Sequence, residues 1–239
     1  MKSSNRSSCL VSPKTRRPLS LADNGILQTP EADEVFSVID GIIHLIDSDR
    51  LGDIQRYEKK IFDEINIRGI PYFRNSLFRR IVIILRSVVR LESPNEFSPL
   101  KAAEMGGGEG YWAQQIKTEF QGAEVFVCDL SVEMLSSVPK YLGRICADVS
   151  GPIFEQGTMD LISFWVSLHH LSAEQREKSL RESVIALKQG GIFLVFEPNN
   201  SFFLRRLLYK ASLRNDIYPD QREQALDFSE ISGVCKKTG

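Results

Sequence analysis

The chain has 239 residues, of which 42% are hydrophobic and 26% charged, and its formal net charge is −1. These values are typical of a globular protein with one main domain and a small appendage, and they exclude a global electrostatic bias toward nucleic acid. The four cysteines lack CxxC spacing, which argues against a disulfide scaffold and favours a reducing cytoplasm. No signal-peptide pattern is present, and no uncharged apolar run approaches the roughly 20 residues that span a bilayer.

The first part of the sequence predicts a small β-rich module. Short apolar pieces and turn residues, without a helical period, run from Cys9 to Ile46. The segment EVFSVIDGIIHLI alternates in part and contains Asp40-Gly41, a turn signal between strands. We therefore expect residues 1–46 to form this module.

Residues 47–97 are predicted to form a helical linker or cap. Apolar residues recur every three or four positions as far as Ile67, as one face of a helix requires. Gly69-Ile70-Pro71 breaks this pattern, and a second helix is predicted over Phe73–Leu91.

From residue 98 onward, short apolar runs alternate with helix-like stretches, which predicts a parallel sheet with right-handed crossovers. The predicted strands are Leu100–Met105, Glu124–Cys128, Arg144–Ala147, Asp160–Val166 and Gly191–Phe196. Ser172 followed by Gln175 predicts the start of the last crossover helix, and Gly190-Gly191 predicts its stop.

The segment KAAEMGGGEGYWAQQI, residues 101–116, places four glycines between the first of these strands and a helix. Glycine permits unusual φ angles, and parallel sheets bind ligands at the carboxyl ends of their strands. Gly106, Gly108 and Gly110 are therefore expected to let main-chain N–H groups approach a polar or anionic ligand. The dinucleotide pattern G-x-G-x-x-G/A fits only from Gly108 to Ala113, so NAD is disfavoured but stays an alternative.

Five blocks resemble, in order and spacing, those of the class I S-adenosylmethionine (SAM)-dependent methyltransferases. EMGGGEG is similar to the family's E/D-x-G-x-G-x-G, and VFVCDLSVEML to its second strand with a terminal acid. The others are ADV, TMDLISFWVSLHHL and ALKQGGIFLVFEPN. The resemblance covers Leu100 to about Asn200 and is to the ubiquinone and menaquinone C-methyltransferase type. It implies an α/β fold, a Rossmann-like doubly wound, mostly parallel sheet, over residues 98–239.

The resemblance also implies SAM as cofactor and a task for each matching residue. Glu104 would pair with the cofactor's ammonium, Asp129 with the ribose hydroxyls, and Asp148 with the adenine amino group. Phe164 and Trp165 would lie along the cofactor, their main chain holding its methionine end. The implied cofactor-binding set is Glu104, Gly106, Gly108, Gly110, Asp129, Leu130, Asp148, Val149, Phe164 and Trp165.

Three residues are candidates for catalysis. His169 and His170 follow the fourth strand, and Glu197 ends the fifth, so all three lie at the expected binding edge. An imidazole titrates near neutrality and can deprotonate a hydroxyl, although a base helps only an acceptor that must lose a proton. Local packing and hydrogen bonding of these side chains is the alternative.

The segment from Cys9 to Ile46 resembles the small zinc-ribbon module that precedes some of these enzymes. That module normally carries two CxxC pairs, which would fall here at Cys9 and Ser12 and near Gln28 and Glu31. Only one of four ligands remains, and tetrahedral zinc needs four donors. We therefore expect the strand-turn pattern without a metal.

Two basic apolar segments, RNSLFRRIVIILRSVVR and SFFLRRLLYKASLR, predict either a cap over the site, which we favour, or contact with an anionic membrane surface. A lipid-like acceptor would suit both. Nucleic acid is disfavoured because aromatic side chains are not interleaved with the charges. We expect a cytoplasmic protein with peripheral membrane association as an option.

After Glu197 the sequence differs from the pattern of the family that it resembles. Relatives carry two more strands there, whereas DFSEISGVCKKTG predicts a helix. Two arrangements are therefore compatible with the sequence: a shortened sheet with an exposed edge strand, or a sheet whose edge is covered by helices. Two functions are also open: methyl transfer to a small-molecule or lipid-like acceptor, or a catalytically inactive relative that binds SAM or serves as a partner subunit.

Overall fold

The computed structural model describes residues 9–22, 25–46, 80–81, 83, 99–197 and 228–238. Apart from residues 80, 81 and 83, the predicted helical linker lies outside these ranges, and so does the basic segment SFFLRRLLYKASLR. Within the described ranges, no helix has the length and apolar character needed to cross a membrane.

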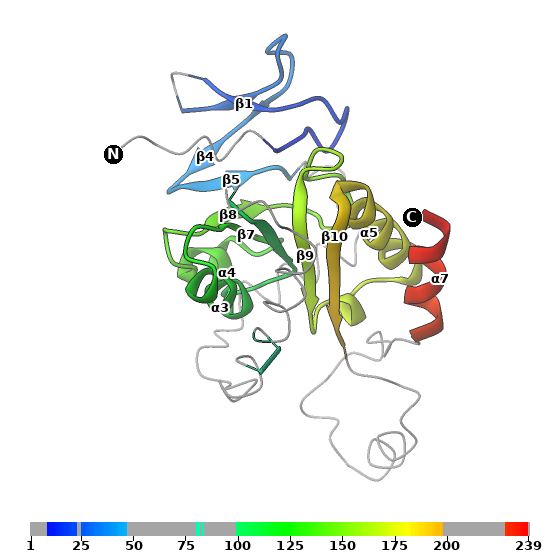
Figure 1. Cartoon of the computed structure of the whole chain (residues 1–239). Coiled ribbons are helices and arrows are strands. Elements are labelled where there is room, and N and C mark those ends of the chain that lie inside the picture. Colours follow the sequence, from blue (N-terminus) through cyan, green and yellow to red (C-terminus); the bar gives the residue numbers. More distant parts are fainter. Residues whose placement is uncertain are drawn as a thin grey trace, which may run out of the picture.

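A seven-stranded sheet in the order β10-β9-β6-β7-β8-β5-β4 forms the centre of the molecule (Figure 1). Its strands are β4 Val38–Ile39, β5 Ile42–His44, β6 Lys101–Met105, β7 Glu124–Asp129, β8 Gly143–Cys146, β9 Met159–Trp165 and β10 Leu187–Phe196. Every neighbouring pair is parallel except β4 and β5. The predicted α/β fold with a mostly parallel sheet is confirmed.

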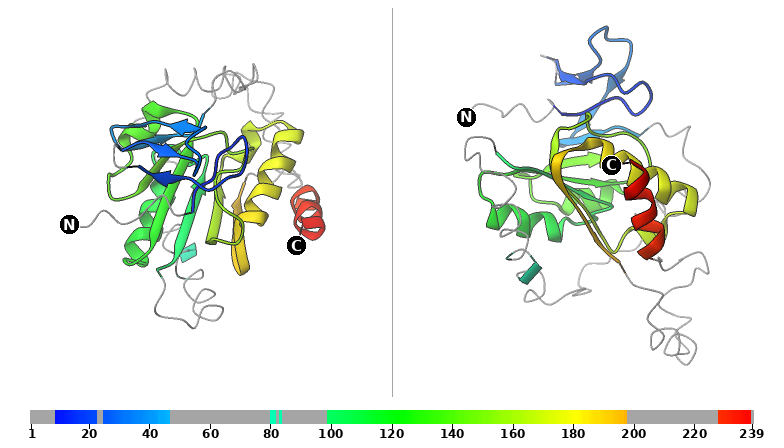
Figure 2. Two further views of the ribbon diagram at one scale, coloured as in Figure 1. Left: turned by 90° about the horizontal axis from the view of Figure 1, so that it is seen from above. Right: turned by 45° about the vertical axis from the view of Figure 1, so that its right-hand side comes forward.

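Helices cover both faces of this sheet, as Figure 2 shows. They are α3 Tyr111–Glu119, α4 Val132–Ser137, the short 3-10 helix η2 Leu168–His170, α5 Ala173–Ala186 and α7 Phe228–Thr238. The core on one face contains buried residues of α3 and α4, whereas the core on the other contains buried residues of α5. Helix α7 packs beside α5, where the sequence predicted a helix.

The central strand β7 shows why the sequence folds in this way. A parallel strand covered on both faces is apolar throughout, and Val125, Phe126, Val127 and Cys128 are all buried. Phe126 and Cys128 face the α5 side, while Val125 and Val127 face the α3 and α4 side. This alternation fixes the register of the strand between two separate cores.

The end of α5 differs from the prediction. The capping box of Ser172 and Gln175 is present, as predicted. However, the helix ends at Ala186 and β10 begins at Leu187, so Gly190-Gly191 is not the helix stop and lies within the strand. The pairing of β10 with β9 shifts between Leu187 and Ile192, and Gly190 has φ +75° there. The two glycines therefore permit the irregular backbone of this part of β10.

The β-rich module of residues 1–46, called the front module below, forms a second, antiparallel sheet and also contributes to the main one. The small sheet has the order β1-β2-β3 and consists of β1 Ser20–Leu21, β2 Leu27–Gln28 and β3 Val35–Phe36. The following hairpin, β4 and β5, joins the main sheet because β5 pairs in parallel with β8. The predicted β-rich segment therefore supplies two of the seven strands of the central sheet.

Arg144 of β8 fastens this hairpin to the sheet. Its side chain is 5% exposed, and its guanidinium donates a hydrogen bond to the carbonyl oxygen of Asp40 in the hairpin turn. Gly41 has φ +75°, and a Cβ atom there would lie 2.8 Å from Nη2 of Arg144. The Asp40-Gly41 turn signal therefore marks a real turn, which needs glycine both for its conformation and for this close approach.

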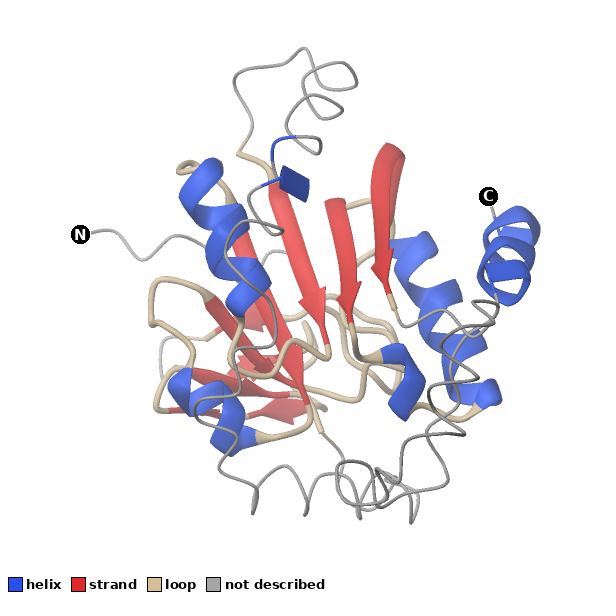
Figure 3. Ribbon diagram, turned by 90° about the horizontal axis from the view of Figure 1, so that it is seen from below, coloured by secondary structure: helices blue, strands red, loops and turns tan. Residues whose placement is uncertain are grey.

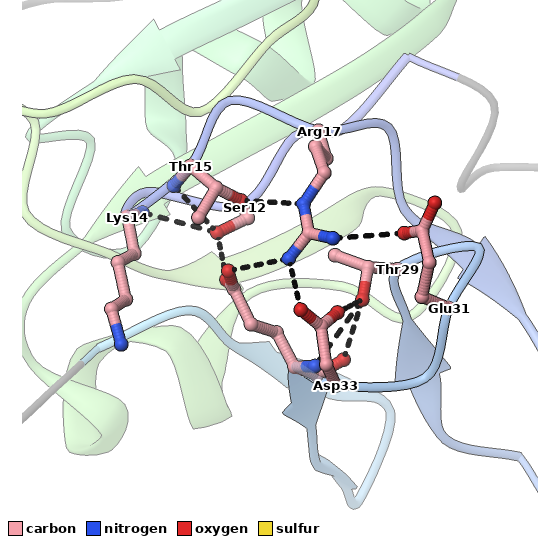
Figure 4. Close-up of polar contacts among 8 residues, drawn as sticks. Ser12, Lys14, Thr15, Arg17, Thr29, Glu31 and Asp33 are labelled. Atoms are coloured by element: carbon pink, nitrogen blue, oxygen red, sulfur yellow. Dashed lines mark hydrogen bonds and ion pairs between the residues drawn. The ribbon is translucent and has the colours of Figure 1, made fainter.

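An ion-pair cluster holds the loops of the front module together (Figure 4). The guanidinium of Arg17 lies 2.8 Å from Glu31, 2.6 Å from Asp33 and 3.1 Å from Glu34. The hydroxyl of Ser12 donates to Glu34. Ser12 and Glu31, two of the positions compared with zinc ligands, thus belong to a cluster organised by a cationic side chain. Among the described residues, no three metal-binding side chains come together.

Candidate functional site

The carboxyl ends of β6 to β10 lie along one edge of the sheet, marked by the arrowheads in Figure 3. Every residue that the sequence assigned to cofactor binding or catalysis lies on one of these strands or in the loop or turn that follows it. The structure therefore brings the two predicted groups to the same edge, as the topology of a parallel sheet requires.

The glycine loop after β6 is hydrogen-bonded within the chain. The amides of Gly106 and Gly107 donate to the carbonyl oxygen of Cys128, over 2.8 and 3.1 Å. The amide of Gly110 donates to the carbonyl oxygen of Gly107 over 2.8 Å. The first two bonds hold the loop against β7, and the third closes a turn within the loop. Of the amides that the sequence assigned to a ligand, those of Gly106 and Gly110 have these main-chain partners in the protein alone.

Two glycines of the loop are required by their surroundings. Gly106 has φ +63°, and a Cβ atom there would lie 2.7 Å from Cβ of Ser167, in the turn after β9. Gly110 has φ +70°, and its Cβ would lie 2.9 Å from Val127. Both positions combine a left-handed conformation with close approach to a neighbouring element, so both need glycine.

Asp129 ends β7 beside this loop. One carboxylate oxygen, Oδ2, accepts a hydrogen bond from the amide of Gly108 over 2.8 Å, and Oδ1 accepts one from the amide of Ser131 over 2.9 Å. Ser131 in turn caps α4 by accepting from the amide of Met134. Asp129, the residue predicted to bind the ribose, therefore contacts the glycine loop, lies at the start of a helix and has a fixed orientation.

Glu104 lies behind the loop and is only 3% exposed. Its Oε2 accepts a hydrogen bond from the amide of Ala113 over 2.8 Å, in the first turn of α3. Because Gly110 offers α3 no capping side chain, Glu104 supplies a cap from the adjacent strand. Burial raises the pKa of Glu104 to about 8, the charge of Asp129 adds to this rise, and main-chain hydrogen bonds from Ala113 and Trp112 oppose it.

The loop after β8 carries Asp148 and Val149. Oδ1 of Asp148 accepts from both the amide and the hydroxyl of Ser150, over 2.9 and 2.8 Å. The carbonyl oxygen of Val149 accepts from the hydroxyl of Ser179 in α5 over 2.8 Å. Asp148 also lines a cavity of about 440 Å³ together with residues of the front module, among them Phe36 and Ser37. The front module therefore reaches the same loop.

The two aromatic residues at the end of β9 point in opposite directions. Phe164 is fully buried and packs edge-on against Phe193, so only its main chain can reach the crevice. Trp165 is partly exposed, with its ring stacked on Trp112 at 4.9 Å and on Phe196 at 4.3 Å between ring centroids. Trp112 is fully buried, whereas the partly exposed rings of Trp165 and Phe196 place an apolar surface at the carboxyl ends of β9 and β10.

The turn after β9 brings the three catalytic candidates together. Oε1 of Glu197 accepts from the amides of Ser167 and Leu168, each over 2.6 Å. Its Oε2 lies 2.8 Å from Nδ1 of His169. The ring of His170 lies 4.0 Å from that of His169 between centroids, and burial lowers the pKa of His170 to about 3, with the neighbouring charge of His169 as a second cause. His170 is therefore neutral and a weak base at neutral pH.

Sequence reasoning missed two residues of this turn. Val166 has φ +55°, a strained conformation for a β-branched residue, and nothing in its sequence context indicates this. Ser167 donates a hydrogen bond from its hydroxyl to the carbonyl oxygen of Met105 over 2.9 Å. Only its proximity to the histidine pair could have pointed to it.

Comparison with known proteins identifies the domain. Residues 102–191 match a family described as Methyltransferase domain. The plantazolicin methyltransferase BpumL, solved with S-adenosylhomocysteine (SAH), is 18% identical with a TM-score of 0.54, covering 80% of this chain and 70% of that one. The CurJ carbon methyltransferase is 17% identical with a TM-score of 0.52, covering 71% of this chain and 50% of that one.

A third structure, phosphoethanolamine N-methyltransferase 2 from Haemonchus contortus, is 21% identical with a TM-score of 0.45, and this chain spans only 36% of its length. No curated protein matches the sequence. Residues 102–191 thus match a methyltransferase domain, and the chain shares its fold with a solved methyltransferase that binds SAH. The cofactor of such enzymes is SAM. The loop that glycine alone can form and the acid fixed beside it fit such a cofactor.

Proposed function

We propose that the protein is an enzyme that binds SAM at the carboxyl edge of the sheet and transfers its methyl group to a small-molecule or lipid-like acceptor. The single observation that carries the proposal is the hydrogen bond from Gly108 to Asp129, which joins the glycine loop and the acid at one point. A carboxylate accepts up to about four hydrogen bonds, so Asp129 can hold the loop and ribose hydroxyls at the same time.

The other residues have separate tasks in this proposal. Glu104 would pair with the ammonium of the methionine part, whose positive charge would favour the ionised carboxylate, and the loop of Asp148 and Val149 would meet the adenine. The cofactor supplies a methyl group on a sulfonium, a reactive donor with a good leaving group. The task of the chain is then to hold the acceptor in line, and such alignment is worth about 7–11 kcal/mol of the barrier.

An acceptor that loses a proton would need a base, and His169 is the better candidate of the two histidines. Its Nδ1 faces the carboxylate of Glu197, which leaves Nε2 as the basic atom of the neutral ring. The low pKa of His170 makes that residue a weak base. The partly exposed stack of Trp165 and Phe196 offers an apolar wall, which supports a lipid-like acceptor.

Calorimetric titration of the full chain with SAM and SAH tests the proposal. We expect micromolar binding that Asp129→Asn weakens at least about tenfold, which is about 1.4 kcal/mol. Asp160→Asn is the matched control, since Asp160 bonds Lys101 and Lys188 at the opposite edge of the sheet. Equal affinity of Asp129→Asn and wild type would refute the ribose assignment. Binding without turnover across a panel of acceptors would favour the inactive relative, and binding of NAD instead would favour a dehydrogenase.

A further inference from the structure

We propose that Glu197 is a positioning residue, which holds the strained turn after β9 against the glycine loop and separately fixes the tautomer of His169. The inference rests on the proposed function, because the loop it shapes is the proposed cofactor site. Glu197 was a candidate base from its place in the sequence. Its contacts give it a different task.

The two carboxylate oxygens of Glu197 have distinct partners. Oε1 accepts from two consecutive amides, Ser167 and Leu168, each over 2.6 Å, and Oε2 faces Nδ1 of His169 at 2.8 Å. The side chain is only 4% exposed. A carboxylate that accepts from main-chain donors on one oxygen and an imidazole on the other is stabilised as an acceptor, and it is poorly placed to take a proton from an acceptor molecule.

The turn that Glu197 grips is strained at its first residue. Val166 has φ +55°, which a β-branched side chain adopts only when its surroundings enforce it. Its amide donates to the carbonyl oxygen of Phe196 over 2.8 Å, and the next two amides donate to Glu197. Two consecutive residues at the end of β10 therefore impose the conformation of the turn.

This turn packs directly against the glycine loop. The hydroxyl of Ser167 bonds the carbonyl oxygen of Met105, and its Cβ occupies the space that a side chain on Gly106 would need. If Glu197 released the turn, Ser167 would lose its fixed place beside Gly106. The end of β10 is thereby coupled through one carboxylate to the loop after β6.

The two tasks can be separated by substitution. In Glu197→Gln, the amide oxygen still accepts from Ser167 and Leu168, but the NH₂ group faces Nδ1 of His169 and requires it to be an acceptor. We therefore expect this variant to keep the turn and to switch the neutral His169 from the Nδ1–H to the Nε2–H tautomer. Glu197→Ala removes both interactions.

The experiment combines hydrogen exchange of the Ser167 and Leu168 amides, ¹⁵N spectra of labelled histidine, and SAH titration of the full chain. We expect Glu197→Ala to lose at least about tenfold in exchange protection and in SAH affinity, and Glu197→Gln to stay within about threefold in both while the His169 tautomer changes. Glu174→Gln, on the exposed side of α5, is the matched control. Unchanged protection and affinity in Glu197→Ala, or an unchanged tautomer in Glu197→Gln, would overturn the inference.

A second variant covers the case in which Glu197→Ala fails to fold. Glycine adopts φ +55° without strain, so Val166→Gly combined with Glu197→Ala should recover part of the lost protection and affinity. No recovery would contradict the role assigned to strain. Failure of the wild-type protein to bind SAM or SAH would instead refute the proposed function, while the exchange and tautomer measurements, made without ligand, would still decide the role of Glu197.

Discussion

Oε2 of Glu104 lies 2.8 Å from the amide nitrogen of Ala113, and this carboxyl group therefore caps α3 from the neighbouring strand β6. The side chain is 3% exposed, and its pKa is raised to about 8 by burial. The residue that the family resemblance assigned to the cofactor's ammonium thus has a structural task in the protein alone, and its ionisation is costly there.

This raised pKa predicts how stability depends on pH. Between the ordinary pKa of 4.5 and about 8, the folded state binds more protons at Glu104 than the unfolded state does, so this group lowers stability as pH rises. The loss approaches about 1.4 kcal/mol per pH unit within that window. Urea unfolding of wild type and Glu104→Gln should therefore differ in pH dependence, with the variant flatter between pH 5 and 8.

Glu133→Gln in α4 is the control for the Glu104 experiment, because Glu133 is exposed and should leave the pH dependence as in wild type. Parallel pH profiles for wild type and Glu104→Gln would show that Glu104 is already ionised in the folded protein at neutral pH.

Gly106→Ala should damage both the fold and the site. The new Cβ would lie 2.7 Å from Cβ of Ser167 at a residue with φ +63°, so the loop or the turn after β9 must move. We expect a loss of about 1–3 kcal/mol in the free energy of unfolding and at least about tenfold weaker SAH binding, measured by urea unfolding and calorimetry.

The matched control for that substitution is Gly122→Ala, because a Cβ at Gly122 meets nothing within 4 Å. It should leave SAH affinity as in wild type. If Gly106→Ala had as little effect as Gly122→Ala, the turn that contains Ser167 would be able to move at little energetic cost. That result would also contradict the role inferred for Glu197.

The front module should depend on Arg17 and not on a metal. Hydrogen bonds from Arg17 and Thr29 lower the pKa of Asp33 to about 2, so this contribution to stability is present above the usual pKa of 3.8 and is lost as pH falls through about 2. Arg17→Ala should increase proteolytic cleavage of the module and lower the melting temperature only slightly, because such exposed ion pairs contribute little to stability.

A chelator tests the metal directly, and it should leave the melting temperature of the wild type unchanged. Arg181→Ala is the control for Arg17→Ala, since Arg181 is an exposed residue of α5. A fall in melting temperature with the chelator would instead indicate a bound metal, which a structural site would need for folding.

Much of the main sheet could be predicted because its strands follow simple rules. The run from Val125 to Cys128 is apolar on both faces, and the Ser172 capping box is a local signal, so both were predicted correctly. The end of α5 was not, because Gly190-Gly191 is equally compatible with a helix stop and with an irregular strand. That choice is made by pairing with β9, which a local pattern does not contain.

The candidate site, like the sheet, could be predicted from the sequence only in part. The residue types at the strand ends could be located from spacing, since a parallel sheet collects them at one edge. The burial of Glu104, the in-chain partners of the glycine amides and the conformation of Val166 depend on elements far apart in the sequence. Strain and desolvation arise from those distant contacts, which a single sequence does not reveal.

The pairing of β5 with β8 also constrains how the protein can be made. Ile42 lies opposite Arg144, so a strand completed early in translation has to wait for a partner roughly one hundred residues later. Contacts of such sequence separation form slowly, because a long loop must close before they contribute. The hairpin of β4 and β5 is therefore synthesised long before β8, the strand that holds it in the main sheet.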